Sequence, residues 1–349
     1  MRRLPVYFLI DVSESMVGEP IEMVQEGISQ IITELRKDPY ALETVYVSII
    51  IFAGKPRTLV PLVELYNFYP PKFPIGSGTS IGSAIEYLSN DLDKNIIKNS
   101  PDQKGDWKPI IFLFTDGNPT DKYLSSFSHW EKKNKKSTSI VAVSLGENTD
   151  TSIFRPLTDT VLLLKDINSE SFSKFFKWVT ASIKVNSESI AKTNSDGLQL
   201  APLTNGFLSK IDLEKVFNNK IDENFAVILA KCQSTKRNYL IKYQKRISKT
   251  DFDNFSLDTR DFKLVGAYPI DNNYYELSDG TPNNLSIRTS ELNGFPTCPC
   301  CGNQYGFSHC TCGQIMCTGE EEVNRCPWCS TEAYFSFDSK DININRTRG

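Results

Sequence analysis

An acid and two serines follow the first apolar segment of the chain at alternate positions. Asp11, Ser13 and Ser15 come directly after VYFLI, residues 6–10. A short run that is apolar at every position is typical of a strand buried on both faces of a parallel sheet. We therefore predict that the three side chains leave the carboxyl end of such a strand, where their oxygen atoms can turn toward one point.

Two further oxygen-rich loops are predicted at the same edge of the sheet. GSGTS, residues 76–80, offers Thr79 before a predicted helix, and FTDG, residues 114–117, ends another apolar run with Asp116. Hard divalent cations take oxygen ligands, and Mg²⁺ prefers octahedral geometry with bonds of roughly 2.0–2.1 Å. A site for Mg²⁺, or for Mn²⁺ or Ca²⁺, with one open position is predicted from Asp11, Ser13, Ser15, Thr79 and Asp116.

Turn formation and helix capping are the competing explanation for these residues. Asp and Ser are common where strands end, and Thr79 could cap the helix that follows it. Agreement among three loops favours the metal site. No catalytic group accompanies the acids: GSGTS lacks the lysine of a phosphate-binding loop, and His129 lies in SHWEKKNKK, a stretch typical of a solvated helix face.

A second set of residues with metal-binding chemistry lies near the C-terminus, where eight of the nine cysteines fall between Cys298 and Cys329. Cys298 with Cys301, and Cys326 with Cys329, have the spacing of turns that direct two thiolates at one Zn²⁺, so two such turns would complete a tetrahedral site. The predicted zinc ligands are Cys298, Cys301, Cys310, Cys312, Cys317, Cys326 and Cys329.

The number of zinc ions stays open, since Cys300 and His309 bring the donors in this segment to nine, enough for one or two ions. Clustered cysteines without an export signal favour zinc over disulfides or buried free thiols. Zinc would fold a segment too small for its own core. The acids of GEEEV, residues 319–323, disfavour a surface that faces phosphates.

The elements that must position the acids and hydroxyls alternate between strand and helix. Apolar runs predict strands at residues 6–10, 45–53, 109–115, 139–145 and 161–164. Apolar residues at helical spacing predict helices at residues 21–35, 81–92 and 172–183. This order implies an open, mainly parallel α/β sheet with helices on both faces, in which ligands bind at the carboxyl ends of the strands.

Length and changes in composition predict several parts in the 349-residue chain. The α/β domain spans 1–185, a linker rich in Ser and Asn spans 186–200, a small strand-rich region spans 201–295, and the cysteine module spans 296–338 with a frayed tail after it. Charged residues make up 23% and the net charge is −3, which disfavours a surface built for nucleic acid or anionic lipid. The first apolar run is too short for a leader or a membrane span, so we expect a cytoplasmic protein.

The loop residues resemble those of the von Willebrand factor A domain with its metal-ion-dependent adhesion site. The family motif is an acid and two serines at alternate positions, then a distant threonine and a distant acid, and all five residues match over residues 4–185. In that family the hydroxyls bind the ion directly, one or both acids act through water, and a carboxylate of a partner can fill the open position. The resemblance implies a protein-binding domain rather than an enzyme.

The combination with CPCCG, CTCG and CPWC is similar to the bacterial TerY-like family of tellurium-resistance and chemical-stress loci. That resemblance implies a non-enzymatic scaffold that works with a protein kinase and a PP2C-type phosphatase in a phosphorylation triad. Cys300 and His309 depart from the family pattern. Two alternatives stay open, a nucleic-acid-binding zinc ribbon and a metal-dependent phosphohydrolase.

A basic stretch bears on the nucleic-acid alternative. Alternation of Tyr239, Ile241 and Tyr243 with polar residues favours one half-exposed strand of a hairpin, although its cations could also dock an acidic partner or nucleic acid. The basic residues are Lys236, Arg237, Lys242, Lys245, Arg246 and Lys249.

Overall fold

The structure is a computed structural model of the whole chain. It describes residues 2–116, 119–145, 151–164, 169–193, 201, 208–210, 224–252, 255–280, 285–319, 323–334 and 341–347. The chain forms two compact units. The first contains Met1–Val12, Glu19–Phe73 and Thr79–Lys220, and the second contains Ser13–Gly18, Pro74–Gly78 and Ile221–Gly349.

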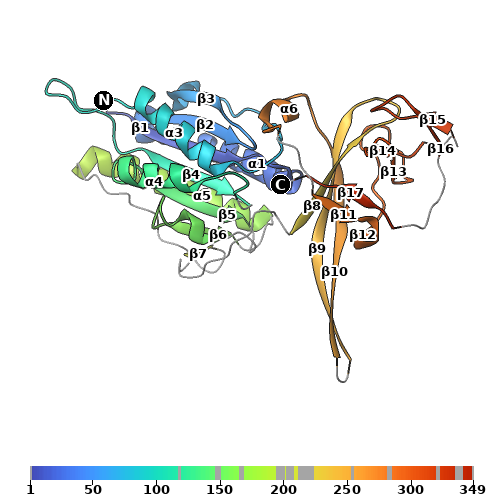
Figure 1. Cartoon of the computed structure of the whole chain (residues 1–349). Coiled ribbons are helices and arrows are strands. Elements are labelled where there is room, and N and C mark those ends of the chain that lie inside the picture. Colours follow the sequence, from blue (N-terminus) through green and yellow to red (C-terminus); the bar gives the residue numbers. More distant parts are fainter. Residues whose placement is uncertain are drawn as a thin grey trace. The chain divides into compact units, whose positions relative to one another are not determined.

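The first unit is built on a seven-stranded sheet in the order β3-β2-β1-β4-β5-β6-β7 (Figure 1). Strands β2, β1, β4, β5 and β6 are parallel, whereas β3 and β7 pair antiparallel at the two edges. The predicted open, mainly parallel sheet is therefore confirmed. The strands are β1 (Leu4–Asp11), β2 (Val45–Phe52), β3 (Pro56–Glu64), β4 (Ile110–Thr115), β5 (Ser139–Leu145), β6 (Val161–Leu164) and β7 (Leu208–Lys210).

Helices cover both faces of this sheet. On one face Tyr7 of β1 and Trp130 of α4 belong to one buried cluster, to which α3 also contributes. On the other face Phe114 of β4 lies edge-on to Phe175 of α5, with ring centroids 5.8 Å apart. The helices are α1 (Glu19–Leu35), α2 (Pro39–Thr44), α3 (Ile81–Asn95), α4 (Leu124–Lys133) and α5 (Ser169–Thr193), with short 3₁₀ turns η1 (Glu14–Met16), η2 (Leu65–Asn67) and η3 (Thr151–Phe154).

Two features at the end of the first unit differ from the predictions. Helix α5 continues to Thr193, so the linker predicted at 186–200 is wrong for residues 186–193, and residues 194–200 lie outside the described part. Serine and asparagine are only weak helix breakers, and extending an existing helix needs no new nucleus. Strand β7 pairs with β6, so the first sheet also extends beyond the predicted boundary at residue 185.

The second unit contains a six-stranded sheet in the order β12-β10-β9-β8-β14-β13. Its two longest strands, β9 and β10, form a hairpin paired from Pro269↔Tyr239 to Phe255↔Phe252, with a register shift between Leu264 and Gly266. Part of this hairpin extends beyond its neighbours as a two-stranded ribbon (Figure 1). The elements are β8 (Phe225–Lys231), β9 (Asn238–Phe252), β10 (Phe255–Pro269), α6 (Asn273–Leu277), β11 (Ser286–Arg288), η4 (Thr289–Glu291), β12 (Leu292–Asn293), β13 (Phe307–His309), β14 (Ile315–Cys317), β15 (Val323–Arg325), β16 (Glu332–Tyr334) and β17 (Asn343–Asn345).

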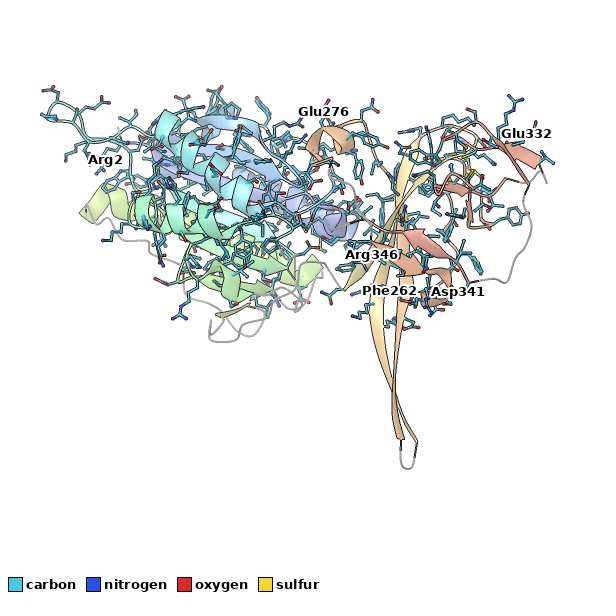
Figure 2. All side chains as sticks on the ribbon, in the orientation of Figure 1. Arg2, Phe262, Glu276, Glu332, Asp341 and Arg346 are labelled. Atoms are coloured by element: carbon cyan, nitrogen blue, oxygen red, sulfur yellow. The ribbon has the colours of Figure 1, made fainter. Side chains whose placement is uncertain are left out.

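The two faces of this sheet are buried against different parts of the unit. Tyr239, Ile241 and Tyr243 of β9 lie in a cluster with three buried cysteines, to which Phe262, labelled in Figure 2, also belongs. Leu240, between them in sequence, lies in a separate cluster. Successive side chains of a strand point to opposite faces, so β9 belongs to two cores at once.

This sheet changes the predicted division of the C-terminal half. Strands β8, β9 and β10 fall in the predicted strand-rich region, but β14 of the cysteine module pairs in parallel with β8. The boundary at 295/296 is therefore wrong, because a pairing between distant segments leaves no local pattern. The frayed tail is also wrong for β17, which pairs with β11 and buries Ile344.

Within the described part of the chain, every helix is too short or too polar to cross a bilayer.

The contact between α1 and α5 yields a test of the packing. A Cβ atom on Gly27 would lie 1.9 Å from the Phe176 ring, so the ring must move. Alanine adds about 1 kcal/mol of helix propensity, but overpacking a core costs about 1–3 kcal/mol. We expect Gly27→Ala to lower the free energy of unfolding by up to about 2 kcal/mol in urea titrations of the full chain. Adding Phe176→Leu should recover part of the loss, and a single variant as stable as wild type would contradict this packing.

Candidate metal centres

Three of the five predicted oxygen ligands lie in the first unit at the carboxyl edge of its sheet. Asp11 is the last residue of β1, and Asp116 follows the last residue of β4, the strand beside it. Thr79 precedes α3 in a loop tied to the end of β2, since the backbone N–H of Ser80 donates to the carbonyl of Ala53 at 2.7 Å. Two neighbouring parallel strands and the loop bonded to the end of β2 therefore place these three residues at one edge of the sheet.

The local contacts hold these side chains inside the protein. The Thr115 hydroxyl donates to the Asp11 carboxylate at 2.6 Å, and Asp11 is fully buried. The backbone N–H of Thr79 donates to the Thr120 hydroxyl at 2.9 Å, and the Thr120 N–H donates back to the Thr79 carbonyl at 2.9 Å. Asp116 has an exposed fraction of 7%. The loop after β4 and the loop before α3 are thus fastened to each other.

Helix capping does not account for Thr79. The residue at the N-cap of α3 is Ser80, and its side chain makes no capping hydrogen bond. The first-turn N–H groups of Gly82 and Ser83 donate instead to the carboxylate of Asp121, at 3.2 and 2.8 Å. Asp121 does what a capping hydroxyl would do. The competing explanation is therefore removed for Thr79.

The two predicted serine ligands lie in the second unit, in Ser13–Gly18, which we call the serine loop. Ser13 Oγ and Ser15 Oγ are 3.0 Å apart, and both side chains are buried. The loop contains the turn η1, in which the N–H groups of Met16 and Val17 donate to the carbonyls of Ser13 and Glu14. Ser13 stands at the N-cap of η1 without a side-chain capping bond. The serine hydroxyls therefore face each other rather than the backbone of the turn.

The chemistry of these donors fits a hard cation. All five side chains offer oxygen, which suits Mg²⁺, Mn²⁺ or Ca²⁺ and not a soft metal. All five are buried, and three are neutral hydroxyls.

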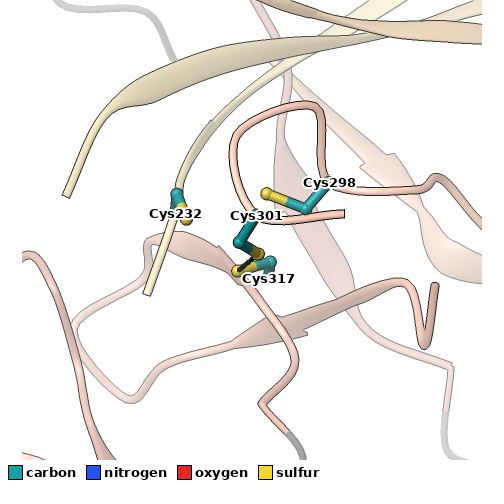
Figure 3. Close-up of side chains that lie close together, drawn as sticks. All are labelled: Cys232, Cys298, Cys301 and Cys317. Carbon is teal, nitrogen blue, oxygen red and sulfur yellow. Dashed lines mark hydrogen bonds between the residues drawn. The ribbon is translucent and has the colours of Figure 1, made fainter. Parts of the chain in front are cut away.

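The cysteines form two groups in the second unit, each with four sulfur atoms within 4.8 Å of one another. The first cysteine cluster is Cys232, Cys298, Cys301 and Cys317 (Figure 3). Cys232 follows β8, Cys298 and Cys301 share a turn, and Cys317 ends β14. The parallel pairing of β8 with β14 brings together Cys232 and Cys317, which are far apart in sequence.

The second cysteine cluster is Cys310, Cys312, Cys326 and Cys329. It joins the turn after β13 to the turn between β15 and β16. The two C-x-x-C turns thus belong to different clusters, and the expectation that they share one metal is wrong. Each C-x-x-C turn is completed by two cysteines from another part of the fold, which the spacing within the turn could not show.

The distances between sulfur atoms match zinc coordination. A tetrahedron with Zn–S bonds of about 2.3 Å has edges of about 3.8 Å. Cys301 and Cys317 are separated by 3.9 Å between their Sγ atoms, Cys310 and Cys329 by 3.7 Å, and Cys312 and Cys326 by 3.9 Å. These separations are far longer than the S–S bond of a disulfide. Both clusters have the dimensions of a four-sulfur zinc site.

Cys232 is the ligand candidate that the sequence analysis missed. Its N–H donates to the carbonyl of Arg237 at 2.8 Å, and the N–H of Lys236 donates to the Cys232 carbonyl at 3.0 Å. The turns at Cys298 and Cys326 have the same pair of bonds, with Gly302 and Ser330 in the place of Lys236. Lys236, Gly302 and Ser330 all have positive φ, at 58°, 77° and 63°. Cys232 therefore stands in a turn of zinc-binding form, and the sequence signal was the need for an eighth thiolate.

One thiol in each cluster is predisposed to ionise. Burial raises the pKa of the Cys232 thiol, but hydrogen bonds from Thr235, Cys301 and Ser234 together outweigh burial and lower this pKa to about 7. Hydrogen bonds from the side chain and backbone of Thr331 lower the pKa of Cys329 to about 6. The thiolate is the form that binds metal.

The donors left open by the sequence lie outside both clusters. Cys300 is half-buried against the core around the first cysteine cluster, where burial raises its pKa. His309 is exposed on β13. Among the described residues, neither belongs to a group of four ligand atoms that could share an ion.

The basic stretch forms β9 of a hairpin as expected, but Lys242 within it is buried rather than exposed.

Solved structures resemble parts of the chain at low identity. Proximal thread matrix protein 1 from the mussel byssus is 16% identical with a TM-score of 0.40, and the match covers 52% of this chain and 48% of that one. A von Willebrand factor type A protein from Catenulispora acidiphila is 12% identical with a TM-score of 0.40, covering 82% of this chain and 61% of that one. The chain thus spans about half the length of the mussel protein, 48%.

Two family models match the chain, one in each half. Residues 6–161 match the von Willebrand factor type A domain, and residues 222–349 match the TerY-C metal binding domain. No curated protein matches. The second match spans Cys232 and all the other cysteines of both clusters. The chain therefore contains a von Willebrand factor type A domain followed by a TerY-C metal binding domain.

Proposed function

We propose that the chain is a non-enzymatic adaptor that binds Mg²⁺ through Asp11, Ser13, Ser15, Thr79 and Asp116 and captures an acidic residue of a partner protein. The observation that supports this proposal is the position of Asp11, Thr79 and Asp116 in segments at one carboxyl edge of the first sheet. The region that matches the TerY-C domain, residues 222–349, which we call the TerY-C unit, binds two zinc ions, one in each cysteine cluster.

Charge explains why such a site would attract an acid. Three of its five donors are neutral hydroxyls, and an acid that acts through water neutralises less of the cation's charge than a direct ligand. The ion then keeps positive charge for a carboxylate from elsewhere. A Mg²⁺ ion also keeps an octahedral position that five ligands cannot fill.

The partners we propose follow from the family resemblance. They are a protein kinase and a PP2C-type phosphatase, with which the chain would form a phosphorylation triad in a cytoplasmic stress response of the tellurium-resistance type. A closed four-sulfur zinc site leaves no position for a substrate, so the TerY-C unit would not be catalytic. It would instead offer a second docking surface. Its zinc ions would act by holding the fold together.

Removing one ligand of the oxygen site should weaken cation binding. We expect Asp11→Asn and Ser13→Ala to raise the dissociation constant for Mn²⁺ at least about tenfold, since even residues that only support a ligand cost 10–100-fold. Calorimetric titration of the full chain measures this constant. Partner proteins retained from the cytosol should be lost in both variants.

The control for these variants is Ser125→Ala, which removes an exposed hydroxyl of α4. Magnesium should be removed by dialysis, because a strong chelator would also strip zinc. Wild-type protein should lose its partners in Mg²⁺-free buffer and regain them when Mg²⁺ is restored. Partner retention that ignores both the ion and the substitutions would contradict the proposed function.

Zinc content tests the assignment of the two clusters. The full chain should carry two zinc ions, one for each group of four cysteines, by elemental analysis. Cys232→Ser and Cys329→Ser each remove one ligand from a different cluster, so each variant should lose about one zinc ion. Cys300→Ser is the matched control and should keep both ions. Full zinc content in Cys232→Ser, together with loss in Cys300→Ser, would exchange the roles of these two cysteines.

A further inference from the structure

A lysine of β9 is buried against the backbone of the serine loop within the second unit. Lys242 has an exposed fraction of 2%, and its ammonium group donates hydrogen bonds to the carbonyls of Ser15 and Val17, the latter at 3.2 Å. It also lies 4.4 Å from the centre of the Phe225 ring. A buried ammonium ion is stable only with such compensation, so these contacts fix both the lysine and the loop.

A tyrosine of α6 holds the next side chain of the same loop. Glu14 stands between Ser13 and Ser15 and is fully buried. Its carboxylate accepts a hydrogen bond from the hydroxyl of Tyr274, and the hydroxyl of Ser77 donates to it at 3.3 Å. Burial, followed by the Glu14 carboxylate, raises the pKa of Tyr274, so the hydroxyl keeps its proton and remains a donor. The residue between the two serines is therefore anchored by its own partner.

Apolar packing closes the rest of the loop. Val17 lies in a cluster with Leu240 and Tyr274, and Tyr268 packs against that cluster. A Cβ atom on Gly18 would lie 2.7 Å from the Tyr268 ring, and its φ of +87° already favours glycine. Substitution there would be blocked by both the ring and the backbone. The serine loop is thus held by charge, by a hydrogen bond and by packing.

Strand β9 connects this contact to the first cysteine cluster. Tyr239, Ile241 and Tyr243 face the core that contains Cys232, Cys298 and Cys317, whereas Leu240 faces the core that contains Val17. Lys242 falls on the same side as Leu240, because alternate residues of a strand share a face. If β9 became less ordered where it packs against the cysteines, Lys242 would therefore also move.

We propose that Lys242 and Tyr274 are positioning residues that set the conformation of the serine loop, and through it the cation affinity of Ser13 and Ser15. The proposal rests on the function proposed above. On this proposal the TerY-C unit regulates the oxygen site. When the TerY-C unit has lost zinc, Lys242 and Tyr274 hold the serine loop less firmly. By linkage, cation binding at the serines and zinc binding at the first cysteine cluster strengthen each other by the same factor.

Lys242→Met tests the proposal with two measurements on the full, zinc-loaded chain. Methionine fills similar space without charge, and the groups it leaves behind are the carbonyls of Ser15 and Val17 rather than an unpaired buried charge. We expect the dissociation constant for Mn²⁺ to rise about tenfold, which corresponds to about 1.4 kcal/mol. In the absence of Mn²⁺, hydrogen exchange at the N–H groups of Met16 and Val17 should become faster, because their bonds in η1 open more often.

A matched pair of tyrosines supplies the control. Tyr274→Phe removes the hydroxyl that donates to Glu14. Tyr275→Phe removes the hydroxyl of the next residue, which accepts from Asn238 at 2.7 Å. Exchange in the serine loop should rise in the first variant and stay at the wild-type rate in the second. Both variants should keep two zinc ions, which verifies that the unit has folded.

The two measurements separate this inference from the proposed function. Unchanged exchange and unchanged Mn²⁺ affinity in Lys242→Met and Tyr274→Phe would overturn it, and so would faster exchange without weaker Mn²⁺ binding. If wild-type protein binds no Mn²⁺, the proposed function fails and the regulation fails with it, while the exchange rates alone decide whether Lys242 and Tyr274 hold the loop. Faster exchange together with weaker Mn²⁺ binding supports the proposal.

Discussion

The alternation of side chains along β9 is the constraint on which the second unit depends. One face of the strand contributes Tyr239, Ile241 and Tyr243 to the core around the first cysteine cluster, and the other contributes Leu240 to the core around Val17. A sheet with so few long strands cannot bury enough apolar surface on one side alone. Each face needs a separate cover, and the chain supplies the first cysteine cluster on one side and the serine loop with α6 on the other.

The first sheet was largely predictable because its strands are buried on both faces. Runs such as residues 110–114 are apolar at every position, which is typical of a strand buried on both faces. Strand β3 was not predicted, since it is a half-exposed edge strand with Pro61 in its interior, which local patterns disfavour. The start of the predicted linker was misread for a related reason. Residues 186–193 are polar and rich in serine, as a linker would be. Helix α5 nevertheless continues through them, because extending a helix that has already formed needs no new nucleus.

The candidate sites were predictable to the extent that their residues are close in sequence. The spacing of Cys298 with Cys301 and of Cys326 with Cys329 was enough to predict zinc. Their grouping with Cys317 and Cys232, or with Cys310 and Cys312, depends on strand pairings such as β8 with β14, which have no local signature. Lys242 was misread in the same way. Its position in a basic, alternating stretch indicated exposure, but a tertiary contact with two carbonyls buries it.

In the function proposed above, the two kinds of donor would direct the two metals to different sites. Zn²⁺ stands near the strong-binding end of the first-row transition metals at most sites, so ligand type and metal availability, rather than affinity alone, must separate it from Mg²⁺. Soft thiolates bind zinc far more strongly than hydroxyls do, and two clusters offer eight of them, of which Cys232 and Cys329 have lowered pKa values. The clusters would therefore fill first and leave the oxygen site to the abundant hard cation. Because the first cysteine cluster shares a core with β9, filling it first would shape the serine loop before that cation arrives.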